Sequence, residues 1–240
     1  MTDVPLIHLI AGTAEARVLS QRIARAGWRQ HLCLEGASRL AQAWPVATQQ
    51  ARPSDRPCKD VSCVIDARHP FDQGGRLPVE DWARRQNVPF LRLRRPTWRP
   101  GPKDRWVCLR SDRLVPRVPL RGLRLFCATG RDGLMVLRRL KDCYFLVRQL
   151  DRHAGPFPLP RGRWVFDTGP FSVAAEIAVM RRLRIDGIVV RNAGGQGAWP
   201  KLAAARQLGL PVVLIDPPSV PAQARSVDEA MQWLKQILDV

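Results

Sequence analysis

The sequence predicts an α/β protein built of two halves, each with a largely parallel sheet, and with a cleft between the halves. Short apolar runs typical of buried strands alternate with amphipathic helical patterns along the 240 residues. A stretch rich in proline and arginine, with weak periodicity, interrupts this alternation near the middle of the chain. We therefore expect an N-terminal domain over residues 1–97, a linker region over 98–121 and a C-terminal domain over 122–240.

The apolar runs and helical patterns give the expected elements. The strands are expected at Leu6–Ile10, His31–Leu34, Val61–Ile65, Pro89–Leu93, Leu123–Ala128, Tyr144–Val147, Gly187–Val190 and Pro211–Ile215. The helices are expected at Ala14–Ala26, Leu77–Gln86, Gly133–Leu140, Ser172–Leu183, Pro200–Leu208 and Val227–Leu238. Gly27 and Gly209 stop two of these helices, and Ser226 with Glu229 forms a capping box at the start of the last one.

Composition indicates a soluble, cytoplasmic protein. The hydrophobic fraction is 45%, no apolar run approaches the length of a membrane span, and no basic region precedes the N-terminal apolar stretch. The six cysteines contain no C-x-x-C pair, and most lie within or beside apolar runs. We therefore interpret them as reduced, mostly buried thiols and expect no metal site.

The net charge of +18 comes almost wholly from arginine, since only five of the 39 basic residues are lysines. Such a field attracts polyanions. The arginines are scattered along the chain without a recognition helix or a basic tail, which does not favour nucleic acid. A small ligand with several carboxylates or phosphates fits equally well, because guanidinium groups pair with both. Solvated surface arginines explain much of the excess in either case.

Glycine, arginine, histidine and hydroxyl residues gather directly after the expected strands. In open α/β sheets, ligands bind in the crevice outside the carboxyl ends of the strands. After the first strand, Gly12 and Thr13 lead into a helix whose free N–H groups and dipole suit a phosphate. We take Gly12, Thr13, Ala14 and Glu15 as candidate cofactor contacts. A simple capping role for Thr13 and a purely dipole-related role for Glu15 stay open.

Two further loops of the first half carry candidate residues. Glu35 suits the ribose of NAD, whereas Ser38 and Arg39 suit the 2′-phosphate of NADP, and the residues alone leave this choice open. His69, in the stretch D-A-R-H-P-F, either transfers a proton near neutral pH or orders the turn before Pro70.

The loops of the second half supply the remaining candidates. The expected cofactor contacts there are Thr129, Gly130, Arg131, Asn192, Gly194 and Gly195. Lys201 lies in the first turn of its helix, where it offers a cation to a phosphate or a substrate carboxylate. The alternative for Lys201 is a solvated helix residue.

Five motifs, in order, resemble those of the precorrin-6A reductase family of cobalamin biosynthesis, and the resemblance covers nearly the whole chain. The motifs are L-I-A-G-T-A-E-A at the start, V-I-D-A-R-H-P-F at 64–71, F-C-A-T-G-R at 126–131, D-T-G-P-F at 167–171 and the stretch at 189–205. The sequence departs from the family pattern at Ala11, Arg68, Arg191 and Ala193, where glycine, threonine, lysine and serine are usual.

The resemblance implies NADPH-dependent reduction of one double bond of precorrin-6A, giving precorrin-6B, without a metal or flavin. It implies a polycarboxylate tetrapyrrole as substrate, with Arg68, His69, Arg191 and Lys201 as contacts and His69 as candidate proton donor. Neighbouring pathway enzymes are then the expected partners, with no membrane or nucleic acid. The alternatives are cobalt-precorrin-6A as substrate, or a non-catalytic protein that binds a nucleotide or nucleic acid.

Overall fold

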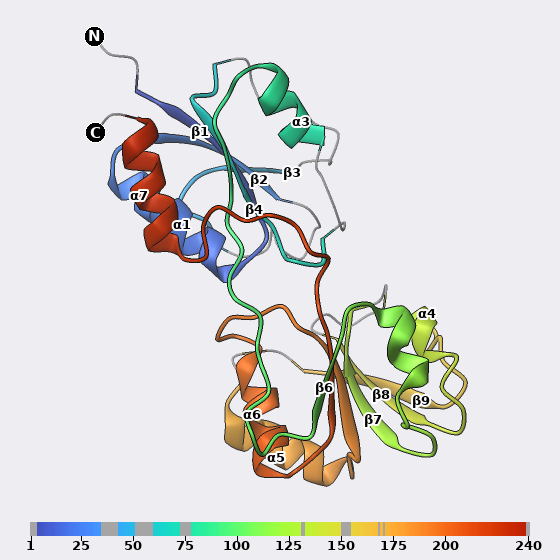
Figure 1. Cartoon of the computed structure of the whole chain (residues 1–240). Helices are drawn as coiled ribbons and strands as arrows, with labels where there is room; N and C mark the ends of the chain where they lie inside the picture. The colour runs from blue at the N-terminus through green and yellow to red at the C-terminus, as the bar shows by residue number, and fades with distance from the viewer. Residues whose placement is uncertain are drawn as a thin grey trace. The chain divides into compact units, whose positions relative to one another are not determined.

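The chain folds into two compact units (Figure 1). The computed structural model describes residues 4–34, 43–50, 60–72, 78–130, 133–149, 155–167, 169 and 171–238. Unit 1 combines Met1–Pro96 with Ser219–Val240, and unit 2 is Thr97–Pro218.

Unit 1 is a five-stranded parallel sheet with helices on both faces. Its strands are β1 (Leu6–Ala11), β2 (Arg29–Leu34), β3 (Thr48–Gln50), β4 (Cys63–Ala67) and β5 (Phe90–Arg92), in the order β3-β2-β1-β4-β5. Helices α1 (Ala14–Arg25) and α7 (Val227–Ile237) lie side by side on the face of Ile7 and Leu9, and α3 (Pro78–Arg85) packs on the face of Ile10. The strand side chains alternate between the two cores, as the period of a strand requires.

Unit 2 is a six-stranded parallel sheet. Its strands are β6 (Trp106–Leu109), β7 (Arg124–Ala128), β8 (Tyr144–Gln149), β9 (Gly162–Phe166), β10 (Gly187–Arg191) and β11 (Val212–Ile215), in the order β6-β11-β10-β7-β8-β9. Helices α5 (Val173–Arg182) and α6 (Trp199–Gln207) cover the sheet face that carries Phe126 and Ile188, and the short helix α4 (Leu134–Leu137) contacts the 3-10 helix η1 (Asp112–Arg117).

The predicted fold class is confirmed, because the structure is an α/β protein with two wholly parallel sheets. The expected domain boundaries need two corrections. The C-terminal segment belongs to unit 1, because α7 buries Ala230 and Leu234 in the same core as Leu19 and Ile23 of α1. The expected linker 98–121 is part of unit 2, because β6 pairs in parallel with β11, far away in the sequence.

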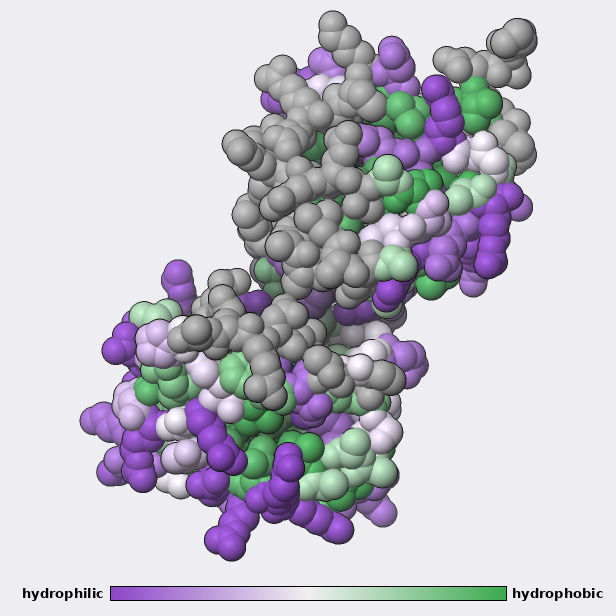
Figure 2. Space-filling model, turned by 180° about the vertical axis from the view of Figure 1, so that it is seen from behind, coloured by the Kyte–Doolittle hydropathy of each residue, from purple (hydrophilic) through white to green (hydrophobic). Residues whose placement is uncertain are grey.

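The surface, the cysteines and the helices can be compared with what the composition indicates. Hydrophilic side chains are interspersed with apolar ones over the face in Figure 2. Within the described residues, no disulfide is formed by the cysteines, which are Cys33, Cys63, Cys108, Cys127 and Cys143. Cys108 is partly exposed and the other four are buried. In the same part of the chain, no helix has the length and apolar character needed to cross a membrane.

Candidate functional site

In unit 1, the strand order reverses at β1. The chain passes from β1 to β2 and β3 on one side, and then returns to β4 and β5 on the other side. Such a switch point leaves a crevice outside the carboxyl ends of the two central strands, and this crevice is the usual ligand site of open α/β sheets. The loops that follow β1 and β4 begin with Gly12–Thr13 and Arg68–His69. The sheet therefore brings together two of the candidate loops.

Thr13 fastens these two loops to each other. Its hydroxyl oxygen accepts a hydrogen bond from the Ala16 N–H (3.1 Å), which caps α1, and its hydroxyl donates to the carbonyl of Ala67 at the end of β4 (3.0 Å). The capping role is therefore confirmed. Because the Thr13 hydroxyl donates its proton to the Ala67 carbonyl and caps the Ala16 N–H, the groups left for an anion at this helix start are the backbone N–H groups that precede Ala16. The Glu15 carboxylate forms an ion pair with Arg95.

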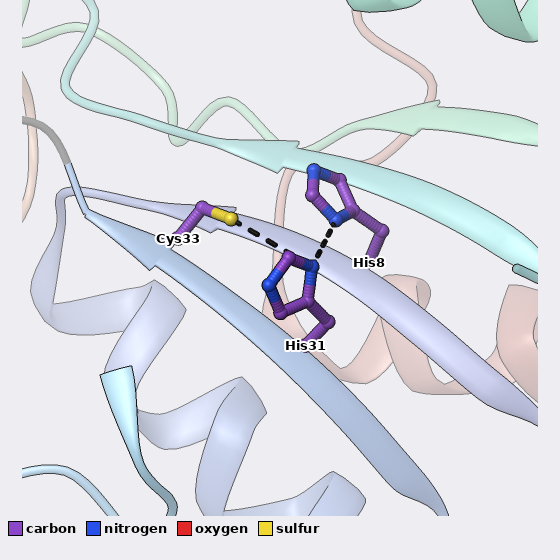
Figure 3. Close-up of side chains that lie close together, drawn as sticks. All are labelled: His8, His31 and Cys33. Atoms are coloured by element: carbon purple, nitrogen blue, oxygen red, sulfur yellow. Dashed lines mark hydrogen bonds between the residues drawn. The ribbon is translucent and has the colours of Figure 1, made fainter. Parts of the chain in front are cut away.

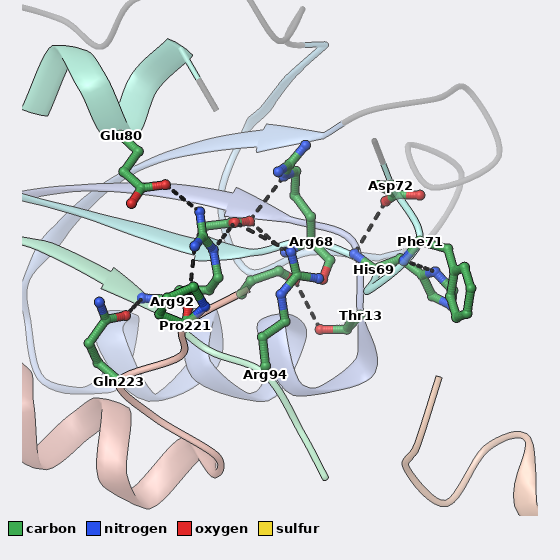
Figure 4. Close-up of polar contacts among 12 residues, drawn as sticks. Thr13, Arg68, His69, Phe71, Asp72, Glu80, Arg92, Arg94, Pro221 and Gln223 are labelled. Carbon is green, nitrogen blue, oxygen red and sulfur yellow. Dashed lines mark hydrogen bonds and ion pairs between the residues drawn. The ribbon is translucent and has the colours of Figure 1, made fainter. Parts of the chain in front are cut away.

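A buried ion-pair cluster lies at the end of β4 (Figure 4). The Asp66 carboxylate accepts hydrogen bonds from Nε of Arg68 (3.0 Å) and Nε of Arg92 (3.1 Å), and Arg94 lies 3.6 Å away. Arg92 also donates to Glu80 of α3 (2.6 Å). Burial alone would raise the pKa of Asp66, but the charges and hydrogen bonds of these arginines outweigh it and lower that pKa. The carboxylate is therefore ionised at neutral pH and holds β4, β5 and α3 together.

The same cluster anchors the C-terminal segment to unit 1. Arg92 donates from its guanidinium to the carbonyl of Pro221 (3.2 Å) and from its backbone N–H to Oε1 of Gln223 (2.8 Å). The Arg94 N–H donates to the carbonyl of Ala224 (2.9 Å). These bonds place the chain so that α7 reaches the core beside α1.

Arg68 and His69 occupy different environments. The Arg68 side chain is fully buried against Asp66, which favours a structural role. The His69 ring is half-buried, and its Nδ1 accepts a hydrogen bond from the Phe71 N–H (3.3 Å), while the His69 N–H donates to Asp72 (3.2 Å). His69 therefore orders its turn. Because Nδ1 acts as acceptor, the proton of the neutral ring lies on Nε2.

Unit 2 has its own switch point between β7 and β10. The chain leaves β7 for β8 and β9 on one side, and returns to β10 and β11 on the other. The guanidinium of Arg191, at the end of β10, lies over the turn after β7, since a Cβ on Gly130 would come within 3.2 Å of its Nη1. Gly130, Gly194 and Gly195 have φ angles of +69°, +66° and +79°, which only glycine adopts readily. The backbone of these glycines and the Arg191 guanidinium therefore lie at the same crevice.

Thr129 and Asn192, two other candidates, are buried. The Asn192 side chain accepts from the Trp98 N–H (2.8 Å) and donates to the Trp98 carbonyl (3.0 Å) and to Asp216 (2.7 Å). Both amide protons of Asn192 are thus in use, so this residue positions the loop after β10 and has no proton left for a ligand.

Lys201 lies inside unit 2, and the alternative of a solvated helix residue is wrong. Its side chain is buried, and Nζ donates to the carbonyl of Ala198 (3.0 Å). Burial, opposed by the charge of Glu176 and helped by that of Arg148, lowers the pKa of Lys201 to about 8. The predicted substrate contact of Lys201 stays a prediction.

Arg148 was missed by sequence reasoning, although a charged residue inside an apolar strand run is a signal for it. Its guanidinium pairs with Glu176 of α5 and with Asp167 (3.3 Å). The guanidinium carbon lies 4.8 Å and 4.4 Å from the ring centroids of Phe126 and Phe171. Asp167 and Phe171, from the motif at 167–171, thus hold this arginine in place.

Four candidates lie outside the described residues, namely Glu35, Ser38, Arg39 and Arg131. The other candidates group into two sets of strand-end loops, one in each unit. Open parallel sheets with glycine-containing loops at their switch points define a protein of the Rossmann-like α/β class.

Comparison with known proteins identifies the family. The sequence pattern of the family described as "Precorrin-6x reductase CbiJ/CobK" matches residues 6–235. The precorrin-6A reductases of Sinorhizobium sp and Rhodobacter capsulatus are 32% and 33% identical to this chain, over 97% and 94% of it and 95% and 94% of their own lengths. A solved structure, "CobK precorrin-6A reductase", superposes with a TM-score of 0.84 at 30% identity and covers 98% of this chain and 97% of its own.

The chain therefore belongs to the precorrin-6x reductase CbiJ/CobK family. It is an oxidoreductase of cobalamin biosynthesis, and the resemblance found in the sequence motifs is confirmed.

Proposed function

We propose that this protein reduces one double bond of precorrin-6A to give precorrin-6B, with NADPH as the reductant. The observation that carries the proposal is the family match over residues 6–235. Relatives named precorrin-6A reductase align with nearly the whole chain and agree with it. The two switch points support it, because they supply strand-end loops suited to a nucleotide and to a carboxylated ring.

The residues of unit 1 fit a dinucleotide. The order β3-β2-β1-β4-β5 places the turn from β1 to α1 at the switch point, as in dinucleotide-binding domains. We assign the pyrophosphate to Gly12 and to the backbone N–H groups of Thr13 and Ala14 at the start of α1. Ser38 and Arg39 follow β2 in the sequence, and we assign the 2′-phosphate to them. When bound, NADPH supplies the hydride, and the protein aligns donor and acceptor.

The exposed parts of the second loop set are assigned to ligand contacts. Arg191 is partly exposed and lies over Gly130, so it offers a guanidinium to a ring carboxylate or a cofactor phosphate. The backbone at Gly194 and Gly195 allows close approach of a ligand. Thr129 and Asn192 support these loops from beneath.

The reduction adds a hydride to one ring atom and a proton to its neighbour, so a proton source is needed. We assign this role to His69 in its imidazolium form, which gives up the Nε2 proton and leaves a neutral ring; in that form Nδ1 carries a proton and no longer accepts from the Phe71 N–H. Buried Arg68 positions the loop through Asp66 and is not assigned to the substrate.

The test is anaerobic mixing of the protein with NADPH and precorrin-6A while absorbance is recorded. We expect one NADPH oxidised per precorrin-6A consumed, and a slower reaction with NADH. Gly12→Glu places a negative charge at the pyrophosphate position and should abolish NADPH binding. Val18→Glu, on the exposed face of α1, is the matched control and should keep it.

Three outcomes would overturn parts of the proposal. NADPH binding without oxidation would indicate a nucleotide sensor. Duplex binding that falls steeply with salt, without NADPH binding, would indicate a nucleic-acid partner. A faster reaction with cobalt-precorrin-6A than with precorrin-6A would move the substrate to the cobalt-containing form.

A further inference from the structure

Three potential metal ligands lie together on one face of the unit 1 sheet (Figure 3). His8 of β1 is the register partner of His31 of β2, and Cys33 follows two residues after His31. Residues two apart on a strand point to the same face, so all three side chains converge. The Nδ1 atoms of the two histidines are 3.0 Å apart, and Sγ of Cys33 lies 3.9 Å from Nδ1 of His31.

We propose that His8, His31 and Cys33 form a binding site for Zn²⁺ or a closely related thiophilic d-block cation. The ligand atoms all lie within 4.8 Å of one another. Zinc binds imidazole nitrogen at about 2.0–2.1 Å and thiolate sulfur at about 2.3 Å, so tetrahedral ligands lie about 3.3–3.6 Å apart. The observed separations approach this geometry, and small side-chain rotations complete it.

The donor set selects the class of cation. One thiolate with two imidazoles suits zinc and its d-block neighbours, whereas Mg²⁺ and Ca²⁺ prefer oxygen ligands. In the absence of a cation, the two Nδ1 atoms at 3.0 Å share a hydrogen bond, so one of them must be protonated and donate to the other. A cation replaces that proton and takes a lone pair from each ring. The fourth position of a tetrahedral site is left to water.

The surroundings allow a cation to enter and to be held. His8 and Cys33 are buried, and His31 is partly exposed, which gives the site a path from solvent. A bound cation would join β1 to β2, the two strands whose loops frame one side of the proposed cofactor site.

This site departs from the expectation of no metal, which followed from the cysteine spacing. The ligands are an H-x-C pair on one strand and a histidine on the next, and only the strand register brings them together. The proposal is independent of the reductase assignment, because its readout is metal binding by the protein without substrate.

The test is titration of the full chain with Co²⁺ after chelator treatment, followed by Zn²⁺ competition. We expect one Co²⁺ per chain, a thiolate-to-cobalt absorption band, and displacement of Co²⁺ by Zn²⁺.

Cys33→Ala should remove the thiolate band. Loss of a residue that only bonds to a metal ligand lowers metal affinity about 10–100-fold, so loss of the ligand itself in His31→Ala should lower the Co²⁺ affinity by at least this factor. Cys63→Ala is the matched control, since Cys63 lies on the opposite face of the same sheet, and it should leave the spectrum unchanged.

Zn²⁺ should also raise the melting temperature of the wild type and of Cys63→Ala, but not of Cys33→Ala. Cys33→Ser keeps the side-chain size, and its circular dichroism shows whether a loss of binding reflects unfolding. The proposal is overturned if no Co²⁺ binds at one equivalent. It is also overturned if the thiolate band survives in Cys33→Ala, or if it is lost equally in Cys63→Ala.

Discussion

Replacing Arg92 with methionine should destabilise unit 1 more than any change of an exposed charge. The Arg92 side chain is 2% exposed and bonds to Asp66, Glu80 and the Pro221 carbonyl. Arg92→Met removes all three bonds and leaves Asp66 with Arg68 and Arg94 as its ion-pair partners among the described residues. Breaking a buried ion pair costs about 3–5 kcal/mol, and we expect a loss of free energy of unfolding in this range.

Urea unfolding followed by circular dichroism measures this loss. The two units should be fitted as separate transitions, since a chain of two domains need not unfold in one step. Arg22→Met is the matched control in the same unit, because Arg22 pairs with the exposed Asp228 and such pairs contribute about 0–1 kcal/mol. If Arg92→Met costs no more than Arg22→Met, the cluster does not hold unit 1 together.

The pH dependence gives an independent check. The pKa of Asp66 is lower in the folded protein than its ordinary value, so its stabilisation is complete above that ordinary value of about 3.9 and is lost as the pH falls through the folded pKa. The difference in unfolding free energy between wild type and Arg92→Met should therefore narrow in acid. A difference that stays constant down to low pH would contradict the role of the Asp66 charge.

Three further predictions concern single residues. The pKa of Lys201 is lowered from 10.5 to about 8, so the unfolded chain binds more protons between these values; wild-type stability should rise with pH across this window. Thermal unfolding at pH 7.5 and 10 should show no such rise in stability for Lys201→Met. An equal rise in the variant would contradict burial of the Lys201 ammonium group as its cause. His69→Ala should lower turnover by about 10²-fold or more with unchanged NADPH affinity in stopped-flow assays. A near-normal rate would mean that His69 only orders its turn. Arg39→Ala should narrow the preference for NADPH over NADH in fluorescence titrations and leave NADH affinity nearly unchanged, whereas equal losses would mean that Arg39 supports the fold.

Strand and helix positions were well predicted where periodicity was strong. The expected helix Ala14–Ala26 and the observed Ala14–Arg25 agree almost completely. Ser226 caps the last helix as expected, since its hydroxyl oxygen accepts from the Glu229 N–H (3.1 Å), but the Glu229 carboxylate accepts from the Arg225 N–H (2.8 Å), one residue before the cap. The short edge strands β3, β6 and β9 were missed. Their segments of three, four and five residues carry little periodic signal, and pairing with β2, β11 and β8, respectively, makes them strands.

The candidate loops were found because their residue types are distinctive, but the roles of individual residues were harder to predict. Thr13, Asn192 and Arg68 carry polar groups of the right kind for ligands, yet the structure engages them with Ala67, Trp98 and Asp66, respectively. A polar residue next to a crevice can face the ligand or support the loop, and spacing along the chain does not distinguish the two.

The sequence by itself determined the α/β class, most element positions, the family resemblance and the strand-end loops, because these depend on local periodicity and on contiguous motifs. Only the tertiary structure decided which unit holds the C-terminal helix, which arginines share Asp66, and that His8 meets His31 and Cys33. Those outcomes depend on strand order and register, which bring together residues far apart in the chain. Burial then sets whether a charged group such as Lys201 meets solvent or the interior.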